Sequence, residues 1–189
     1  MAKTDFKFAT RLRVRWSECD AQGIVFYGVY LDYIEVAQGE YYRNLGLRLY
    51  DPEGRRSFDT ATVKATLEYR SPARVDETLD IHMRVAQIGT SSLTSRYEIY
   101  GADTGLLVLE AEVVAVDYDA ESGAPRRVPD GLRAVIDIFE ATGVAPPLKD
   151  YADLSGLANV NRIHGTCMAH PAFRDTAPGK QPDNPDHQK

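Results

Sequence analysis

Apolar and polar residues alternate near the start of the chain. Between residues 8 and 16 the apolar positions include Phe8, Leu12, Val14 and Trp16, and arginines occupy positions 11, 13 and 15. A period of two is typical of a strand with one buried face, so a strand is predicted over residues 8–16. The turn residues of "SECDAQG" follow and end it.

A helical period replaces this alternation from about Val25. Apolar residues then recur three or four positions apart, and the positions between them are mostly polar. The recurring residues are Tyr30, Tyr33, Ile34, Ala37, Tyr41 and Leu45. This spacing predicts an amphipathic helix of about five turns, closed by Gly46 in a position typical of a helix C-terminus.

Four strands and a second helix are predicted after this long helix. Residues alternate over 61–69 and 79–85, and a further strand is predicted over 92–100. The stretch "LLVLEAEVVAVDY" at 106–118 is apolar enough for a central strand covered on both faces. Short turn signals separate these strands, which favours an antiparallel sheet. The second helix is predicted over residues 129–143. Its apolar side consists of Leu132, Val135, Ile136 and Phe139.

These elements predict an α+β fold in which one antiparallel sheet wraps around one long helix. The sheet keeps bare edges and an uncovered second face, so a homodimer or a higher oligomer such as a homotetramer is expected. Residues 1–143 form the predicted domain. Residues 144–189 are polar and broken by prolines, and are expected to be a C-terminal extension without its own core.

The charge and composition exclude several classes of protein. A net charge of -6 argues against a nucleic-acid binder, which needs a basic surface to displace counterions from phosphates. No apolar run is long enough to span a bilayer, and no secretory signal is expected at the N-terminus. Two cysteines do not suggest a disulfide framework, so a cytoplasmic protein is predicted.

Residues 16–46 bring a carboxylate, a glycine and a helix start close together. The stretch "WSECDAQGIVFYGVYLDYIEVAQ" places Asp20 and Gly23 in the turn that leads into the long helix. A helix N-terminus presents unpaired N–H donors and favours developing negative charge. This order of residues is compatible with a simple turn or cap, and also with an active site.

The stretch resembles the first motif of hotdog-fold acyl-CoA thioesterases, within the 4-hydroxybenzoyl-CoA thioesterase family and its bacterial relatives. "DAQGIVFYGVYLDYIE" is similar to that motif at residues 20, 23–27, 30 and 35. "LEYRSPARVDETLDI" resembles the strand-turn-strand that follows in the family, and "IGTSSLTSRYEIY" the next hairpin. Three segments agree in order over roughly residues 8–140.

The resemblance implies a hotdog fold and hydrolysis of an acyl-CoA thioester to the free acid and coenzyme A, without cofactor or metal. Asp20 would be the nucleophile or the general base, and the backbone N–H of Tyr27 would polarise the thioester carbonyl. Gly23 would let the chain turn tightly enough to direct both groups to one point. An aromatic or short-to-medium acyl group is the expected substrate.

Other residues are expected to bind this substrate. Phe26 and Tyr30 belong to the first motif, and an aromatic residue such as Phe26 could line an acyl pocket. Arg70 and Arg74 flank the "SPA" turn and either meet the phosphates of coenzyme A or are solvated charges. The candidate contacts to pantetheine or nucleotide in the third segment are Ser91 and Ser92.

Several alternatives stay open from the sequence. Glu35 and Glu40 are candidate second carboxylates, although each is more simply a solvated helix residue. Cys19 is interpreted as a small packing residue rather than a nucleophile. His164, Cys167 and His170 have zinc-ligand types, but three ligands in a proline-broken segment are weak evidence for a metal site.

Two other functions remain as alternatives at this level. One is a non-catalytic acyl-CoA-binding or scaffold protein with a hotdog fold. The other is a hotdog dehydratase or hydratase, which usually pairs a His with an acidic residue. Residues 16–46 contain no His, so the sequence disfavours the second alternative.

Overall fold

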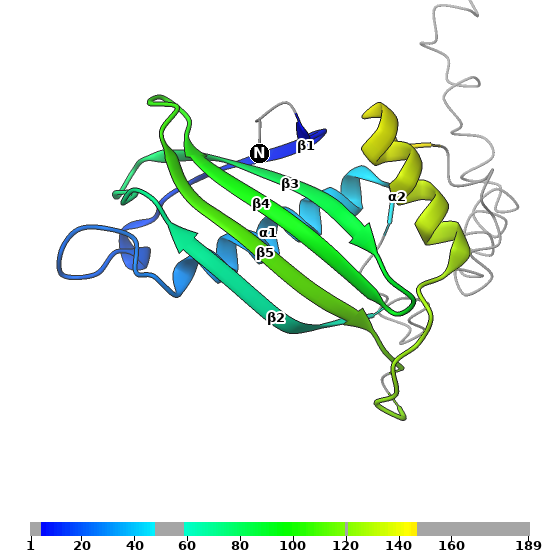
Figure 1. The fold of residues 1–189 in the computed structure, drawn as a ribbon. Helices are drawn as coiled ribbons and strands as arrows, with labels where there is room; N and C mark the ends of the chain where they lie inside the picture. The colour runs from blue at the N-terminus through cyan, green and yellow to red at the C-terminus, as the bar shows by residue number, and fades with distance from the viewer. Residues whose placement is uncertain (1–4, 48–58, 120, 147–189) are drawn as a thin grey trace, which may run out of the picture.

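The computed structural model describes residues 5–47, 59–119 and 121–146, which form five strands, two α-helices and one short 3-10 helix (Figure 1). In chain order the elements are β1 (Phe8–Arg13), η2 (Trp16–Glu18), α1 (Val29–Asn44), β2 (Thr60–Tyr69), β3 (Thr78–Ile88), β4 (Ser92–Gly101), β5 (Leu107–Asp117) and α2 (Asp130–Thr142).

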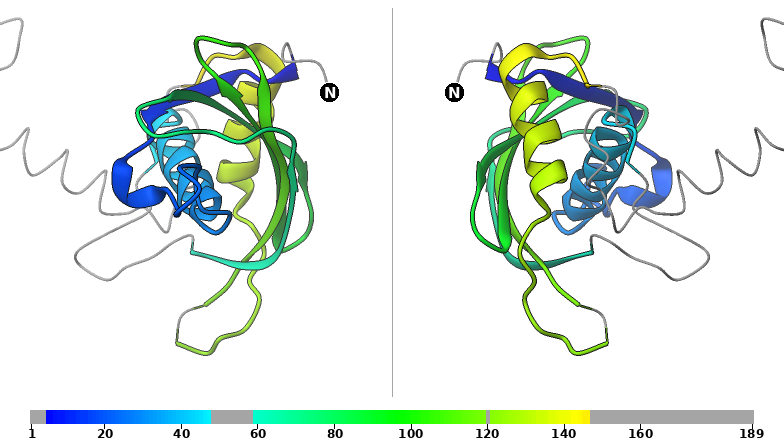
Figure 2. Two further views of the ribbon diagram at one scale, coloured as in Figure 1. Left: turned by 90° about the vertical axis from the view of Figure 1, so that its left-hand side faces the viewer. Right: turned by 90° about the vertical axis from the view of Figure 1, so that its right-hand side faces the viewer.

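The five strands form one antiparallel sheet in the order β1-β3-β4-β5-β2. The consecutive strands β3, β4 and β5 pair through short turns, whereas β2 lies on the far side of β5. Figure 2 shows the sheet curving around α1, which lies along its concave face. The predicted arrangement of one antiparallel sheet around one long helix is therefore confirmed.

The apolar stripe of α1 faces the sheet as predicted. Tyr30, Tyr33, Ile34, Ala37 and Tyr41 are all buried, and none exposes more than 5% of its surface. The helix begins at Val29 rather than near Val25, because the Val25 N–H donates to the Ala73 carbonyl and keeps the chain extended there.

The C-terminus of α1 follows the prediction. Gly46 has a φ of 77°, a conformation that glycine adopts without steric cost, and the helix ends just before it.

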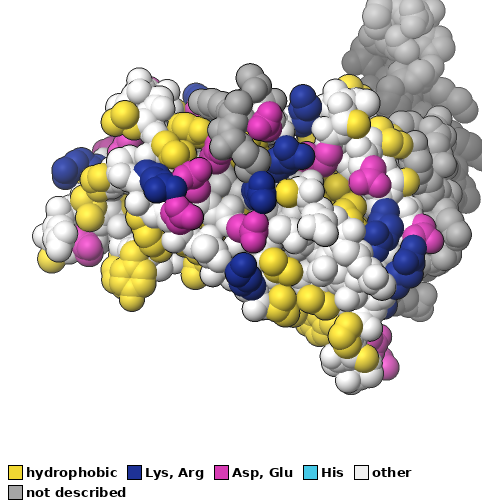
Figure 3. Space-filling view, viewed as in Figure 1, with side chains coloured by type: hydrophobic (Ala, Val, Ile, Leu, Met, Phe, Trp, Pro, Cys, Tyr) yellow, Lys and Arg dark blue, Asp and Glu magenta, His cyan; other side chains and the backbone are white. Residues whose placement is uncertain are grey.

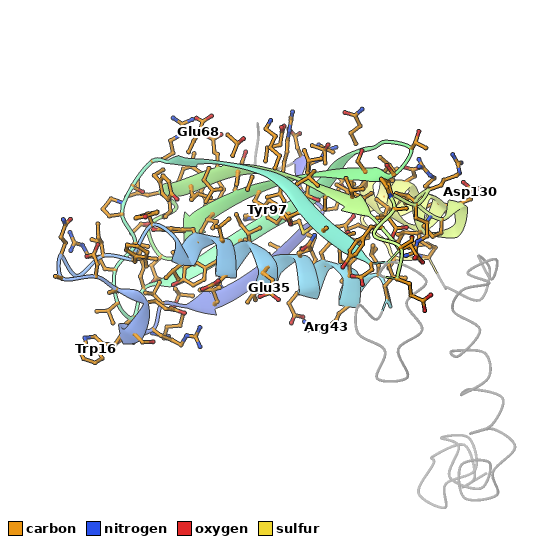
Figure 4. The ribbon with its side chains drawn as sticks, turned by 90° about the horizontal axis from the view of Figure 1, so that it is seen from below. Trp16, Glu35, Arg43, Glu68, Tyr97 and Asp130 are labelled. Carbon is orange, nitrogen blue, oxygen red and sulfur yellow. The ribbon has the colours of Figure 1, made fainter. Side chains whose placement is uncertain are left out.

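The core lies between α1 and the concave face of the sheet. In β3 every second residue from Leu79 to Val85 is buried, and β4 contributes the buried Tyr97. Figure 4 shows Tyr97 between the sheet and α1, with Glu68 on the opposite face of the sheet and Glu35 on the outer side of the helix. The alternation predicted for these strands thus separates core from solvent.

Two predictions for the strands were wrong in detail. The first strand ends at Arg13, and Trp16 lies in η2 with 84% of its surface exposed, so it does not extend the buried face. The β5 strand is buried on one face, while Glu110 and Glu112 on its other face are only half-buried. It lies inside the sheet without being covered on both sides.

The strand β2 lies at one edge of the sheet and is mostly exposed along its length. Ala61, Val63, Ala65 and Tyr69 are exposed, and only Leu67 packs partly into the core. Figure 3 shows apolar side chains along the lower margin of the molecule, where Figure 1 places β2. The burial of this strand does not alternate as predicted, because no layer formed by the described residues covers it.

The helix α2 packs at the far end of the concave face. The Phe139 ring meets the Tyr41 ring of α1 edge to face, and a Glu140 carboxylate oxygen accepts from the Tyr41 hydroxyl at 2.6 Å and from the Val85 N–H at 2.8 Å. The predicted helix and its buried side are confirmed. The predicted extension from residue 144 lies outside the described residues beyond position 146.

No helix in the described ranges combines the length and the apolar character needed to cross a bilayer.

If α2 completes the core, Ile136→Ala will destabilise the protein by about 2–5 kcal/mol, because Ile136 is 1% exposed and its truncation leaves a cavity. The neighbouring Asp137→Ala, at an exposed position, is the control and should change stability by less than about 0.5 kcal/mol. Urea unfolding of both variants measures the difference. Equal small effects would mean that α2 is not part of the core.

Candidate active site

The site begins with the loop between η2 and α1, which is held at both ends by backbone hydrogen bonds. The Asp20 N–H donates to the Ile24 carbonyl at 2.9 Å, and the Phe26 N–H donates to the Glu18 carbonyl at 2.9 Å. Ile24 also forms an isolated bridge with Arg74. The loop is therefore a tight hairpin fastened to the segment that joins β2 and β3.

Asp20 lies at the start of the turn in this hairpin, and its side chain is exposed. One carboxylate oxygen accepts from the Gln22 N–H at 2.7 Å, which fixes the side chain in an Asx turn. Gly23 has a φ of 72°, and a side chain there would be strained. The role predicted for Gly23 in closing the turn agrees with this conformation.

A second carboxylate, Glu18, lies two residues before Asp20 but is 7% exposed. Its oxygens accept from the Tyr33 hydroxyl, the Arg15 N–H and the Arg15 guanidinium, each at 2.7 Å. Burial opposes ionisation of Glu18, but these donors outweigh it and hold the pKa of Glu18 below its ordinary value. Glu18 thus ties the loop to the second turn of α1.

The N-terminus of α1 supplies unpaired donors. The Phe26 N–H and the Val29 N–H are engaged, with the Glu18 and Phe26 carbonyls respectively. Within the part of the chain that the structure describes, the N–H groups of Tyr27 and Gly28 have no hydrogen-bond acceptor. Two successive backbone donors are free at the positive end of the helix dipole.

A cleft of about 380 Å³ lies beside this helix start. Its lining brings together Asp20, Ile24, Val25, Tyr27, Tyr30, Tyr69, Arg70, Ser71 and Pro72. Tyr30 is 3% exposed, and burial raises the pKa of its hydroxyl, which therefore stays protonated at neutral pH. The carboxylate, the helix start and Tyr30, which were predicted from sequence, thus share one cleft.

Tyr69 is a member of this cleft that sequence reasoning missed. Its hydroxyl donates to the Tyr27 carbonyl at 3.0 Å, and its ring meets the Tyr30 ring edge to face at 5.6 Å. Its position directly before the candidate Arg70 in "LEYRSPARVD" was the one feature of the sequence that could have indicated Tyr69 as a site residue. The alternation of β2 indicated only a residue on the apolar face.

The two arginines proposed for phosphate binding differ in their environment. The Arg70 guanidinium is paired with Glu68 and with Glu110, so its charge is already compensated. Arg74 is exposed, and its side chain makes no ion pair within the described ranges. Of the two, Arg74 has the charge available for an anionic ligand.

Ser91 and Ser92 are not brought to Asp20 within one chain. Ser92 pairs with Val116 at the end of the sheet where β2 begins, whereas Asp20 lies near the end of β2 at Tyr69. Phe26 lies next to Tyr27, with their ring centroids 4.3 Å apart, but it does not line the cleft.

The remaining candidates stay outside the cleft. Glu35 is exposed, and Glu40 is paired with Arg43 on the outer side of α1. Cys19 is half-buried and packs against the core. His164, Cys167 and His170 lie outside the described residues, and no group of three metal-ligand side chains gathers within the described part.

The arrangement is suited to attack on a carbonyl. The exposed Asp20 and Tyr27 line one cleft, and the N–H groups of Tyr27 and Gly28 lie at the helix start beside it. Such donors stabilise an oxyanion, and the carboxylate can act on a carbonyl carbon or on a water molecule.

Comparison with known proteins identifies the family. A model of the thioesterase superfamily matches residues 22–108. A putative esterase of Aquifex aeolicus is 30% identical over 67% of this chain and 98% of its own length. The chain belongs to the thioesterase superfamily.

Other relatives of this thioesterase agree with that assignment. The acyl-CoA thioester hydrolase YbgC of Escherichia coli is 31% identical over 67% of the chain and 93% of the relative. The prediction of a thioester hydrolase is confirmed at the level of the family.

Solved structures confirm the hotdog fold of this thioesterase. A protein of Aquifex aeolicus superposes with a TM-score of 0.62 at 26% identity, covering 68% of this chain and 98% of that one. A thioesterase of Thermus thermophilus complexed with coenzyme A and zinc superposes with a TM-score of 0.61 at 23% identity, covering 72% and 96%.

The Glu18 network leads to a prediction about pH. Because the pKa of Glu18 is lowered in the folded state, its contribution to stability is present above the unfolded value near 4.5 and is lost as the pH falls through the folded pKa. Glu18→Gln should cost about 1–3 kcal/mol at pH 7 and progressively less in acid. Urea unfolding between pH 7 and pH 3 measures this difference.

The exposed Glu35→Gln is the matched control and should show no such pH-dependent difference. A Glu18→Gln cost that stays constant down to pH 3 would contradict the role of an ionised Glu18 in holding the loop.

Proposed function

We propose that this protein hydrolyses an acyl-CoA thioester to the free acid and coenzyme A, with Asp20 as nucleophile or general base. The observation that supports this most directly is the cleft itself. Asp20 and Tyr27 line it together, and the free N–H groups lie at the helix start beside it.

In this reaction the thioester carbonyl oxygen accepts hydrogen bonds from the N–H groups of Tyr27 and Gly28. As general base, Asp20 takes a proton from water while the water oxygen bonds to the carbonyl carbon. The tetrahedral oxyanion then collapses, the C–S bond breaks, and the thiolate leaves and is protonated. As nucleophile, the Asp20 carboxylate attacks the carbonyl carbon and the C–S bond breaks, so that the coenzyme A thiolate leaves and an acyl-enzyme anhydride remains. Water then hydrolyses the anhydride to the free acid and the Asp20 carboxylate.

The two donors contribute because they are already oriented. Each is fixed in the backbone before the substrate binds, so little reorganisation is needed as negative charge develops on the oxygen. Loss of one such donor typically costs about 100–1000-fold in rate. The cleft lining within the described residues contains no His, which disfavours a dehydratase or hydratase that uses one.

The acyl and coenzyme A groups are assigned to different parts of the site. Tyr30 and Tyr69 line the cleft with their rings in edge-to-face contact, which suits an aromatic or short-to-medium acyl group, and Phe26 contacts Tyr27 of the lining. Arg74, which forms no ion pair with another described residue, is the better candidate for a coenzyme A phosphate, and Arg70 is the second. The Thermus relative bound to coenzyme A supports this choice of carrier.

We also propose that the protein is cytoplasmic and forms a homodimer through β2. Two such dimers would pair to give a homotetramer. The other edge strand, β1, carries Arg11 and Arg13, and charged edges resist pairing. The exposed β2 is long and carries the apolar Val63, so a second copy of the same strand is the partner that fits.

This pairing would bring opposite ends of the two β2 strands, one from each chain, close together. An antiparallel β2–β2 contact places the start of β2 in one chain beside the Tyr69 end in the other. The hairpin carrying the partner's Ser91 and the partner's Ser92 then approaches the cleft, which would explain their separation from Asp20 within one chain.

Asp20→Asn should reduce kcat for acyl-CoA hydrolysis at least about 100-fold, equivalent to about 2.7 kcal/mol of barrier, because the base or nucleophile is lost. Release of free thiol from aromatic, short and long acyl-CoAs measures it. Asp32→Asn removes an equal charge from the first turn of α1, at an exposed position outside the cleft, and should retain activity.

Turnover by Asp20→Asn equal to that of the wild type would exclude Asp20 from the chemistry. Tight acyl-CoA binding by the wild type without thiol release would favour the non-catalytic binding protein instead.

Val63→Asp should convert the dimer to monomers, because it places a charge in the proposed β2–β2 contact. Light scattering after size-exclusion chromatography gives the mass. Ala9→Asp, an exposed position on the other edge strand, is the control and should leave the dimer intact. A Val63→Asp protein that stays dimeric would refute this interface.

A further inference from the structure

Tyr69 contacts the backbone of the helix start as well as the cleft. It is the last residue of β2, and its hydroxyl donates to the Tyr27 carbonyl at 3.0 Å. The first turn of α1 closes one residue later, where the Leu31 N–H donates to the Gly28 carbonyl at 3.1 Å. The Tyr27 carbonyl therefore takes its hydrogen bond from a side chain on a different element.

This hydrogen bond acts on the peptide unit that carries the Gly28 N–H. The Tyr27 carbonyl and the Gly28 N–H belong to one planar, trans peptide group, in which they point in opposite directions. Fixing the carbonyl direction consequently fixes the direction of the N–H. Glycine at position 28 has no side chain to restrict rotation, so the constraint has to come from outside the residue.

The support behind Tyr69 is rigid. Tyr69 pairs with Leu109 in the sheet, the Arg70 N–H donates to the Val108 carbonyl at 2.8 Å, and the Ser71 hydroxyl donates to the Leu107 carbonyl at 2.7 Å.

The ring of Tyr69 is held as well. It meets the Tyr30 ring at 5.6 Å and an interplanar angle of 71°. Both the backbone and the ring are thus fixed before the hydroxyl reaches the helix.

We infer that Tyr69 is a positioning residue, whose hydroxyl orients the Tyr27–Gly28 peptide so that the Gly28 N–H is directed at the developing oxyanion. The inference rests on the proposed thioester hydrolysis. Tyr69 does not touch the reacting atoms in this role. It sets the geometry of a donor that does, and such geometry contributes to the transition state more than to substrate binding.

The test is Tyr69→Phe, which keeps the ring and its contact with Tyr30 but removes the hydroxyl. We expect kcat to fall about 10-fold, equivalent to about 1.4 kcal/mol, with KM changed less than about twofold. The amide nitrogen resonance of Gly28 should shift in NMR spectra, because the carbonyl of the same peptide group loses its hydrogen bond. Tyr100→Phe is the matched control, because the Tyr100 hydroxyl donates at 2.6 Å to Glu98, and neither residue lines the cleft.

The outcomes separate this inference from the proposed function. If Asp20→Asn is inactive but Tyr69→Phe keeps the wild-type kcat and the wild-type Gly28 amide resonance, the positioning role is wrong and the hydrolysis stands. A higher KM at unchanged kcat would make Tyr69 a substrate contact instead. Equal losses in Tyr69→Phe and Tyr100→Phe would indicate general destabilisation. Absence of thiol release by the wild type would overturn both proposals.

Discussion

The structure depends on burial of the apolar side of α1 in the concave face of the sheet. Tyr33, Ala37 and Tyr41 each expose 2% of their surface or less. Burial of a large side chain contributes about 1.5–3 kcal/mol to the free energy of folding. This packing fixes the axis of α1 relative to β3 and β1. It therefore also fixes where the N-terminus of the helix, with its free donors, meets the end of the sheet.

The loop before α1 contains two carboxylates with opposite environments. Glu18 is buried and receives hydrogen bonds from Arg15 and Tyr33, so it serves to hold the loop. Asp20, two residues later, is exposed and bonded only within its own turn among the described contacts, so it is accessible to a substrate. The hydrogen-bond partners, rather than the residue type, assign the two carboxyl groups their different roles.

The sequence predicted the features that depend on local periodicity. The stripe on α1, the alternation of β3 and β4, the second helix and the Asp20–Gly23 turn all follow from spacing and turn chemistry, and the family resemblance added the hotdog arrangement. Prediction from the sequence failed where a structural feature depends on contacts between segments that are far apart along the chain. Because β1 pairs with β3, β2 is left at an edge and its apolar positions stay exposed, which no local pattern indicates.

The same reason explains the missed residues of the site. The Tyr69 hydroxyl reaches Tyr27 across 42 positions of sequence, and Tyr33 reaches Glu18 across 15, so neither contact is visible in a motif. Trp16 continued the alternation of the first strand, yet the chain had already turned into η2, where the side chain projects outward (Figure 4).

The central claim is that the thioester carbonyl binds at the N-terminus of α1. A crystal structure of the Asp20→Asn variant with an unhydrolysed acyl-CoA tests it most directly. We expect the carbonyl oxygen at hydrogen-bond distance, about 3 Å, from the N–H groups of Tyr27 and Gly28, with the carbonyl carbon facing residue 20. A carbonyl bound away from the helix start, or one that leaves both donors solvated, would contradict it.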